Sequence, residues 1–284
     1  MSFADPSPSG QPPPRIGPLL RALRVRRGYS QLALALHTGV SQRHLSCLET
    51  GKAQPSQAML LALMDALGVP LAERNQALMA AGFAPHYPRS DWGAQALLQV
   101  RDALRRLLKA HEPAPAMLLD AQWNLLETNA AVPALMRLIG FVPGQATPGE
   151  PLNLLDLLLR PDGLQRWLID APRVAQAVRQ RAEAEAPFNP ALAARLQAMP
   201  SARHRTAATL AVTPRPHSPV LLLQLQSGAG VLSFMSAYTT LGSPMDVTLD
   251  SLRIDHLLPA DASTREALER SHSIVRGFGL LCFQ

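Results

Sequence analysis

Four glycines interrupt a helical pattern near the start of the chain, and this spacing constrains the fold more than any other feature. Between residues 15 and 81, apolar side chains recur every three or four positions, which is typical of amphipathic helices. Glycine is favoured where a helix ends, because it adopts left-handed backbone angles at low cost. The glycines are Gly28, Gly39, Gly51 and Gly68. We therefore expect five short helices, over residues 15–27, 30–38, 41–49, 56–67 and 71–81.

The first part of the chain carries all of its excess positive charge. Residues 1–112 contain 13 Lys and Arg against 7 Asp and Glu, whereas residues 113–284 contain 14 against 14. The net charge of +6 is therefore 13 − 7, and it lies entirely before residue 113. A basic unit followed by a neutral unit is typical of a nucleic-acid binder joined to a second domain.

Residues 30–52, SQLALALHTGVSQRHLSCLETGK, read as two helices joined by a tight turn. Ser30 and Ser41 are placed to cap these helices, since a serine oxygen accepts a hydrogen bond from a free backbone N–H. In the first helix we expect the inward-pointing side chains to be Leu32, Ala33 and Leu36. In the second, at 100° per residue, Leu45 and Leu48 share one face, and the roughly opposite face carries Arg43, Ser46, Cys47 and Thr50, with Gln42 at its edge.

This segment resembles the Xre/Cro-type helix-turn-helix family of phage and bacterial repressors, and the resemblance covers residues 15–81. Its most specific features are Gln31, the Gly39–Val40–Ser41 turn and the run Leu48-Glu49-Thr50-Gly51-Lys52. The resemblance implies that Gln31 contacts phosphate or a base and that Gln42, Arg43 and Cys47 face the bases. It also implies a structural ion pair between Arg24 and Glu49.

The chemistry of the side chains supports these roles. Arg43 can present two N–H groups to guanine O6 and N7, and Gln42 can pair with adenine N6 and N7. Thr50 and Lys52, near the groove edge, are better placed for phosphate, which positions a protein without reading sequence. The expected DNA-binding residues are Gln31, Ser41, Gln42, Arg43, Ser46, Cys47, Thr50 and Lys52. Cysteine departs from the usual polar residue at position 47, which weakens the prediction of a base contact there.

Beyond Pro113 the sequence pattern changes from purely helical to a mixture of predicted strands and helices. Residues 116–129 read as strand, turn, strand, and helical segments follow to about residue 200. Three further runs, rich in Val, Leu and Thr, predict strands at 206–213, 219–226 and 230–241. The pattern predicts an α+β domain with a five-stranded antiparallel sheet and helices on one face.

This part resembles the ligand-binding domain of MmyB-like regulators, which have a PAS-like fold. The resemblance is carried by residues 115–136, 153–170 and 239–268. It implies a cavity for a small, largely apolar molecule, with a fatty-acid-like ligand as one candidate. Alternation along residues 230–241 places Leu232, Phe234 and Tyr238 on one face, and with Trp123 they are the expected lining. A closed, fully packed core is the alternative.

No pattern indicates catalysis or a bound metal. The sequence contains no GxSxG, Walker-type loop or GxGxxG after a strand. His204, His217, His256 and His272 are scattered, and Cys47 and Cys282 form no CxxC pair. We place Asp246, Asp250, Asp255 and Asp261 around turns and helix caps. We expect no catalytic residues, no metal, no cofactor, no signal peptide and no membrane span, and hence a cytoplasmic protein.

We therefore predict a multidomain chain, in which an all-α five-helix helix-turn-helix domain precedes an α+β PAS-like domain. The expected parts are a proline-rich tail (1–14), the DNA-binding domain (15–81), a linker with an amphipathic helix (82–112), the ligand-binding domain (113–270) and a C-terminal tail (271–284). The predicted function is a transcription regulator, a repressor, that binds double-stranded DNA as a homodimer and responds to a small ligand. Two alternatives remain: a C-terminal domain that only dimerises or binds a partner, and an enzyme with an appended DNA-binding domain. The role of the helix at 94–111, in a dimer interface or in the second domain, stays open.

Overall fold

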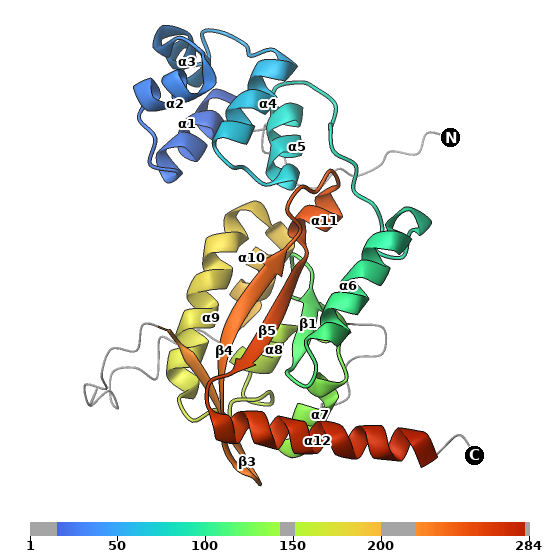
Figure 1. The fold of residues 1–284 in the computed structure, drawn as a ribbon. Helices are drawn as coiled ribbons and strands as arrows, with labels where there is room; N and C mark the ends of the chain where they lie inside the picture. The colour runs from blue at the N-terminus through green and yellow to red at the C-terminus, as the bar shows by residue number, and fades with distance from the viewer. Residues whose placement is uncertain (1–15, 143–150, 200–219, 282–284) are drawn as a thin grey trace, which may run out of the picture. The chain divides into compact units, whose positions relative to one another are not determined.

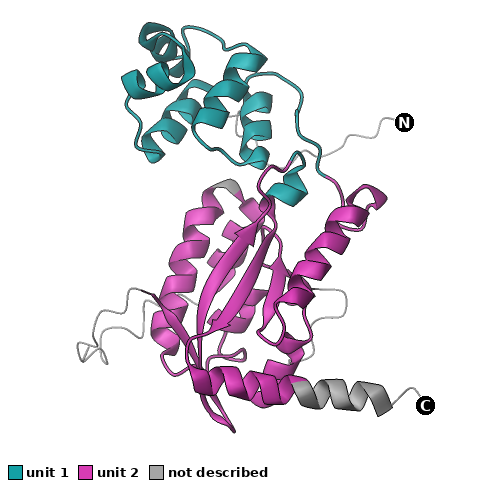
Figure 2. Cartoon of the chain, viewed as in Figure 1, with its two compact units in different colours: residues 1–89, 245–250 teal, residues 90–244, 251–284 magenta. Residues whose placement is uncertain are grey.

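The glycine-divided stretch folds into five short helices, as the sequence predicts (Figure 1). The structure, a computed structural model, describes residues 16–142, 151–199 and 220–281. Its two compact units are residues 1–89 with 245–250, and residues 90–244 with 251–284 (Figure 2). The helices of the first unit are α1 (Ile16–Arg26), α2 (Gln31–Thr38), α3 (Gln42–Glu49), α4 (Gln57–Ala66) and α5 (Leu71–Ala80).

Local hydrogen bonds account for where these helices begin and end. The Ser30 side chain accepts from the N–H of Ala33, and the Ser41 side chain accepts from the N–H of His44. Gly39, between the two helices, has a φ of 72°, a left-handed angle that glycine adopts without strain. The expected helix boundaries therefore agree with the observed ones to within two residues.

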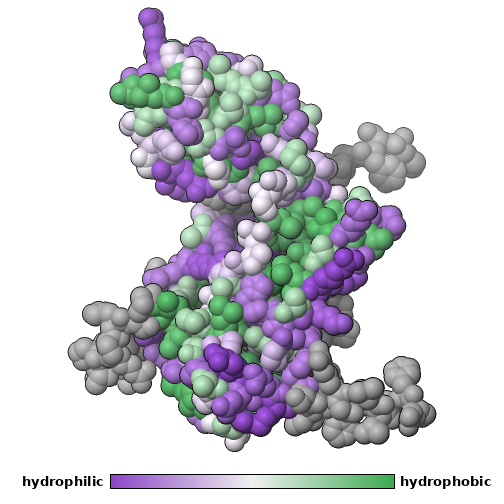
Figure 3. Space-filling model, in the orientation of Figure 1, coloured by the Kyte–Doolittle hydropathy of each residue, from purple (hydrophilic) through white to green (hydrophobic). Residues whose placement is uncertain are grey.

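The predicted inward face of α2 is wrong. Leu34 is fully buried and Ala35 nearly so, whereas Leu32 is 51% exposed and Leu36 is 77% exposed. Ala33 is exposed as well. An eight-residue helix with apolar residues at almost every position has no unique apolar stripe, so spacing alone could not select the buried face. In the space-filling view, apolar patches interrupt the polar surface of the first unit (Figure 3).

The second unit is built on a five-stranded antiparallel sheet with strand order β2-β1-β5-β4-β3. Two hairpin-like strand pairs are separated along the chain by helices, and β5 lies between them in the middle of the sheet (Figure 1). The strands are β1 (Ala116–Leu119), β2 (Leu125–Thr128), β3 (Leu222–Ser227), β4 (Gly230–Thr240) and β5 (Arg253–Pro259). The α+β class with an antiparallel sheet is therefore confirmed.

One strand of the sheet, β5, differs from the strands that the sequence predicts. The central strand β5 was not predicted, and Asp255, expected at a turn or cap, lies buried within it. Asp255 and His256 break the apolar run of this segment, which hid the strand. Both have partners that only the folded sheet supplies, because Ser236 donates to Asp255 and Thr239 lies 2.9 Å from His256 Nε2. The predicted strand at 206–213 lies outside the described residues.

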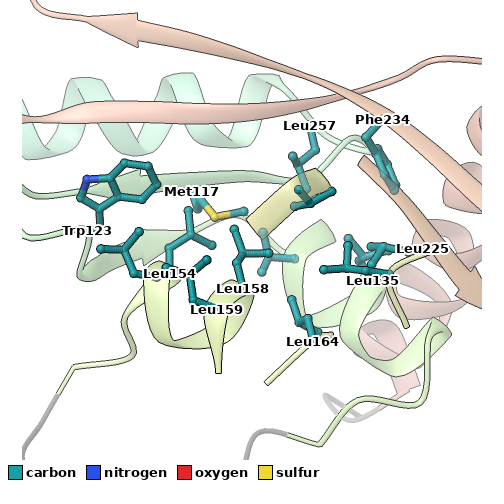
Figure 4. Packing of buried hydrophobic residues seen from close by; sticks show 14 of the residues in the cluster. Met117, Trp123, Leu135, Leu154, Leu158, Leu159, Leu164, Leu225, Phe234 and Leu257 are labelled. Atoms are coloured by element: carbon teal, nitrogen blue, oxygen red, sulfur yellow. The ribbon is translucent and has the colours of Figure 1, made fainter. Parts of the chain in front are cut away.

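Helices cover one face of the sheet and enclose its apolar core (Figure 4). The core joins Met117 of β1, Phe234 of β4 and Leu257 of β5 to leucines of the covering helices. In chain order, the helices of this unit are η1 (Gln95–Leu97), α6 (Leu98–Ala110), α7 (Ala131–Leu138), α8 (Leu154–Leu159), α9 (Ala171–Glu185), η2 (Ala186–Phe188), α10 (Pro190–Ala198) and α12 (Ala262–Leu281); α11 (Val247–Ser251) lies almost entirely in the segment that belongs to the first unit. The last of them, α12, runs through residue 270, so the boundary expected there falls inside a helix.

The amphipathic helix predicted at 94–111 corresponds to η1 and α6 and belongs to the second unit. Leu104 and Leu108 are buried, and the carbonyl of Leu108 accepts a hydrogen bond from the Asn129 side chain. The ring of His111, just after α6, meets the ring of His256 edge-on, with centroids 4.6 Å apart. This helix is therefore anchored on the sheet of the second unit.

Candidate functional site

Helix α3 presents polar side chains from a firmly held position. Leu45 and Leu48 bury its inner face, while Gln42 and Arg43 are exposed at its N-terminal end. A helix with one packed face and free polar groups near its N-terminus has the form needed to enter a major groove. The exposed end of α3 is thus the part of this unit best suited to meet a nucleic acid.

The other candidate residues of this surface divide into exposed and half-buried groups. Ser41, Thr50 and Lys52 are exposed, whereas Ser46 and Cys47 are half-buried. The Thr50 hydroxyl donates to the carbonyl of Ser46 over 2.8 Å, so its donor is already used within the helix end. A phosphate contact by this hydroxyl would have to replace that bond.

A buried network ties α3 to the two helices before it. Arg24 of α1 donates from Nε to Glu49 Oε1 over 2.6 Å and from Nη2 to Glu49 Oε2 over 2.8 Å. Gln31 at the start of α2 donates to the same Oε2 over 2.8 Å. Burial acts to raise the pKa of Glu49, but the hydrogen bonds from Arg24 and Gln31 outweigh it and the pKa is lowered. Gln31 therefore has a structural partner in addition to its expected DNA contact.

Two arginines of α1 and its C-terminal turn also have partners within the unit. Arg26 donates to Glu73 of α5 over 3.1 Å, and Arg27 donates to the carbonyl of Gly68. The Glu73 carboxyl is buried, and this burial raises its pKa to about 7 despite the nearby guanidinium groups of Arg26 and Arg27. These contacts join α1 and its C-terminal turn to α5 and to the turn before α5.

Three of the four predicted ligand-binding residues pack in the core of the second unit. Trp123 is 1% exposed, Leu232 is 1% exposed and Phe234 is fully buried. Figure 4 shows Phe234 close to Leu225 and Leu257. Tyr238, on the same face of β4, is instead 39% exposed. Within the described residues, two surface hollows lie in the first unit, and none of the four candidates lines either of them.

A polar cluster that the sequence analysis missed surrounds Trp123 and Tyr238. The guanidinium of Arg181, from α9, lies 3.5 Å from the centroid of the Tyr238 ring. That of Arg253, from β5, lies 4.3 Å from the Trp123 ring, whose N–H donates to Glu185 over 2.8 Å. Alternation along β5 would have placed Arg253 and Asp255 on this face, but the strand itself was not recognised.

A strained backbone angle and two raised pKa values occur in this same cluster. Trp123 has a φ of 67°, an angle that costs a bulky residue roughly 1–2 kcal/mol and is held here by packing. Burial raises the pKa of Asp255, although Ser236, Arg181 and Arg253 all favour its charged form. Burial, followed by the charge of Asp255, also raises the pKa of Tyr238. Such perturbed groups collect where a protein has a binding function more often than elsewhere.

The connection between β4 and β5 contributes a segment to the first unit. Residues 245–250 belong to that unit (Figure 2), and within it the Asp250 carboxylate accepts from the N–H of Leu71 at the start of α5 over 2.8 Å. The N–H of Val247 donates to the carbonyl of Pro88 over 2.8 Å. The neighbouring strands β4 and β5 are thus joined along the chain by a segment that packs within the unit of the helix-turn-helix.

A metal site and a membrane-spanning helix each place requirements on the described residues. Residues 16–142, 151–199 and 220–281 contain no group of three or more His, Cys, Asp or Glu side chains that could hold a metal ion. Cys47 is a free thiol. Within the same ranges, the helices are too short or too polar to cross a membrane.

Comparisons with known proteins agree with the predicted order of domains. A family model described as a helix-turn-helix domain matches residues 15–77. A model described as the MmyB-like transcription regulator ligand binding domain matches residues 100–270, which is more than half of the chain. No curated protein matches the chain.

Two chains of solved structures match as well. One, described as "Structure of an RNA-binding Light-Oxygen-Voltage Receptor", is 14% identical, with a TM-score of 0.25. The match covers 91% of this chain and 62% of that one, so this chain spans less than two thirds of it. A TM-score this low does not establish a shared fold.

Proposed function

The chain belongs to the family of MmyB-like transcription regulators, and we propose that it represses transcription by binding an operator as a homodimer under the control of a small ligand. The observation that carries the proposal is the geometry of α3. Its back is buried through Leu45 and Leu48, its end is tied to α1 through Glu49, and its exposed N-terminal end offers Gln42 and Arg43. A reading helix needs this combination of a fixed orientation and free polar groups.

In this proposal the exposed groups divide into readers and anchors. Arg43 reads guanine through two parallel N–H groups and Gln42 reads adenine, each pair contributing about 1–3 kcal/mol of discrimination. Ser41 and Lys52 contact phosphate and set the register of the protein on the duplex. Gln31, Ser46, Cys47 and Thr50 complete the surface, although their side chains are less free than those of the readers.

A homodimer would read two half-sites. Two copies of α3 related by a two-fold axis would enter successive major grooves about 34–36 Å apart, which predicts a palindromic operator. The ligand would act by favouring one arrangement of the two copies over another, because an effector changes an equilibrium only through different affinities for its states. Residues 245–250 offer the route, because they lie between β4 and β5 in the chain and Asp250 binds the first residue of α5.

The experiment that tests DNA reading selects sites from a library of random duplexes with the purified full-length protein. We expect enrichment of two inverted half-sites separated by about one helical turn, or 10–10.5 base pairs between centres. The salt dependence of the affinity counts the phosphate contacts, with a slope of about −0.9 for each. If no sequence is enriched and binding follows total charge alone, the proposal of an operator-specific regulator is wrong.

A second candidate function is favoured by the packing of the second unit. Trp123, Leu232 and Phe234 are buried in a shared core, as expected if this unit only joins two chains. Mass spectrometry of the denatured protein separates the two candidates. A released fatty-acid-like molecule at near one per chain supports a ligand-responsive regulator, whereas its absence together with a stable dimer supports dimerisation alone.

A further inference from the structure

The face of the sheet opposite the core carries a second, smaller apolar layer, on the side where α6 packs. Leu118 of β1 pairs with Ile254 of β5, and both side chains are buried although neither belongs to the main core. Leu104 and Leu108 of α6 are also buried outside that core, and α6 lies beside β1 (Figure 1). Side chains alternate across a strand, so His256 lies on the same face of β5 as Ile254. A histidine of the middle strand therefore faces α6.

The rings of His111 and His256 are in direct contact on this side of the sheet. Their centroids are 4.6 Å apart, and their planes meet at 71°. His256 is buried, and its Nε2 lies 2.9 Å from the hydroxyl oxygen of Thr239. His111 is the residue that ends α6, and its carbonyl accepts from the N–H of Ala114 over 3.0 Å. The ring contact therefore joins the C-terminal end of α6 to the middle strand of the sheet.

The surroundings of His111 favour its neutral form. Within the part of the chain that the structure describes, the Nε2 atom of His111 is buried and has no hydrogen-bond partner. A neutral imidazole carries one N–H, whereas the charged ring carries an N–H at both nitrogens. Protonation would therefore place a charged N–H at this buried position without an acceptor, which is unfavourable.

The charges near the two rings do not offset their burial. Burial lowers the pKa of His111, and the charge of His256 lowers it further. Burial also lowers the pKa of His256, although the carboxylate of Asp255 acts to raise it. Glu112, next to His111 in the chain, faces another group, because its Oε2 lies 3.7 Å from Nε2 of His272 on α12. Each ring of the pair thus takes up a proton more readily once it has left this contact.

We propose that His111 and His256 form an acid-sensitive latch, which holds the C-terminal end of α6 on the sheet while both rings are neutral and releases it when either ring is protonated. Histidine suits this role because its charge changes between about pH 5 and 8. Helix α6 is the last helix before β1 on the chain segment that leads from the first unit to the sheet. The latch therefore controls how firmly this segment is fixed to the second unit. This inference goes beyond the proposed function, because the latch needs neither DNA nor a bound small molecule.

The test is hydrogen–deuterium exchange of the full-length protein between about pH 7.5 and 5.5, with the intrinsic exchange rate of each amide at each pH taken into account. The amides of residues 104–110 report local opening of α6, and those of β4 and β5 report unfolding of the sheet. We expect the opening constant of α6 to rise by up to about tenfold per pH unit for each proton that opening takes up. The amides of the sheet should keep their protection while those of α6 lose it.

The variant that should abolish this response combines His111→Phe with His256→Gln, which removes both titrating rings. Phenylalanine keeps an aromatic ring at position 111, and a glutamine amide can still bind the Thr239 hydroxyl. The opening constant of α6 should then no longer change with pH. The matched control is His86→Phe, because His86 also meets an aromatic ring edge-on, that of Tyr87 with centroids 4.8 Å apart, but is exposed and lies in the first unit. This control should respond to pH as the wild type does.

Each outcome bears on the proposal. Acid-dependent opening of α6 in the wild type and in His86→Phe, lost in the double variant, supports the latch. Unchanged protection of α6 in the wild type, or the same pH dependence in the double variant, overturns it. If the double variant does not fold, His111→Phe alone decides, because it should show a shallower pH dependence than the wild type and an unchanged one overturns the proposal. The samples contain no DNA, so failure of the latch is distinguishable from failure of the proposed function.

Discussion

Asp250 and Leu71 are 179 positions apart, yet the Asp250 carboxylate accepts a hydrogen bond from the Leu71 backbone N–H over 2.8 Å. Leu71 is the first residue of α5, whose preceding residue, Pro70, makes no side-chain cap. A carboxylate from the β4–β5 connection thus caps a helix of the first unit. Its negative charge also suits the positive end of the helix dipole.

Replacing Asp250 with alanine should therefore destabilise α5. We expect the free energy of unfolding of the first unit to fall by about 1 kcal/mol, as for loss of an ordinary helix cap. Urea denaturation followed by circular dichroism measures this loss. Asp162→Ala is the control, because Asp162 is exposed and pairs with Arg160, two positions away in the chain. Equal stabilities of the two variants would contradict a capping role.

Arg43 and Lys52 should differ in what their loss does to DNA binding. Arg43→Ala should cost about 1–3 kcal/mol on the best operator and relax the preference at one base pair. Lys52→Ala should weaken binding to all sequences similarly and reduce the salt slope by about 1. Competition binding at fixed salt, followed by a salt titration, measures both effects. An unchanged base preference in Arg43→Ala would remove Arg43 from the reading residues.

Breaking the buried pair of Arg24 and Glu49 should be far more costly than breaking a similar pair at the surface. Glu49→Gln leaves a buried guanidinium without its counter-charge, which costs roughly 3–5 kcal/mol. Glu127→Gln removes the partner of Arg105, which has the same paired geometry but is 53% exposed, so solvent screens the pair and its loss should cost far less. Chemical denaturation compares the two. Similar losses would mean that burial does not determine the strength of these pairs.

Glu73 should make the first unit less stable as the pH rises from about 4.5 to 7. Its pKa is about 7 in the folded chain and 4.5 in the reference state, so the folded state binds the extra proton in this window. Stability falls where the folded state binds more protons, and it levels off above the folded pKa. The charges that face the carboxyl are Arg26, Arg27 and Asp250.

Glu73→Gln should abolish this fall, which amounts to at most about 3 kcal/mol. The measurement is the free energy of unfolding at pH 5, 6, 7 and 8. Glu183→Gln, at an exposed position, is the control and should follow the wild type. A wild-type stability that rises between pH 5 and pH 7, with no difference for Glu73→Gln, would show that this carboxyl is ionised throughout.

Local interactions explain what could be predicted from the sequence. Serine caps at Ser30 and Ser41 and the left-handed glycine at Gly39 act within a few residues, so the helices of the first unit were located almost to the residue. The same reasoning located the polar end of α3, whereas the two families were predicted from resemblance and are matched by the family models. The hairpins at the two edges of the sheet were also predicted, because their strands are neighbours in the chain.

Tertiary structure decided what depends on residues far apart in the sequence. The buried face of α2 is chosen by its packing partners, and an evenly apolar helix such as residues 31–38 does not reveal it. Strand β5 pairs with both β1 and β4, and its polar residues Asp255 and His256 find hydrogen-bond partners on β4, which no local pattern could show. Arg253 acquires its environment from Trp123 and Glu185, which lie 130 and 68 positions away. These residues are far apart in the sequence, and only the folded chain brings them together in one cluster.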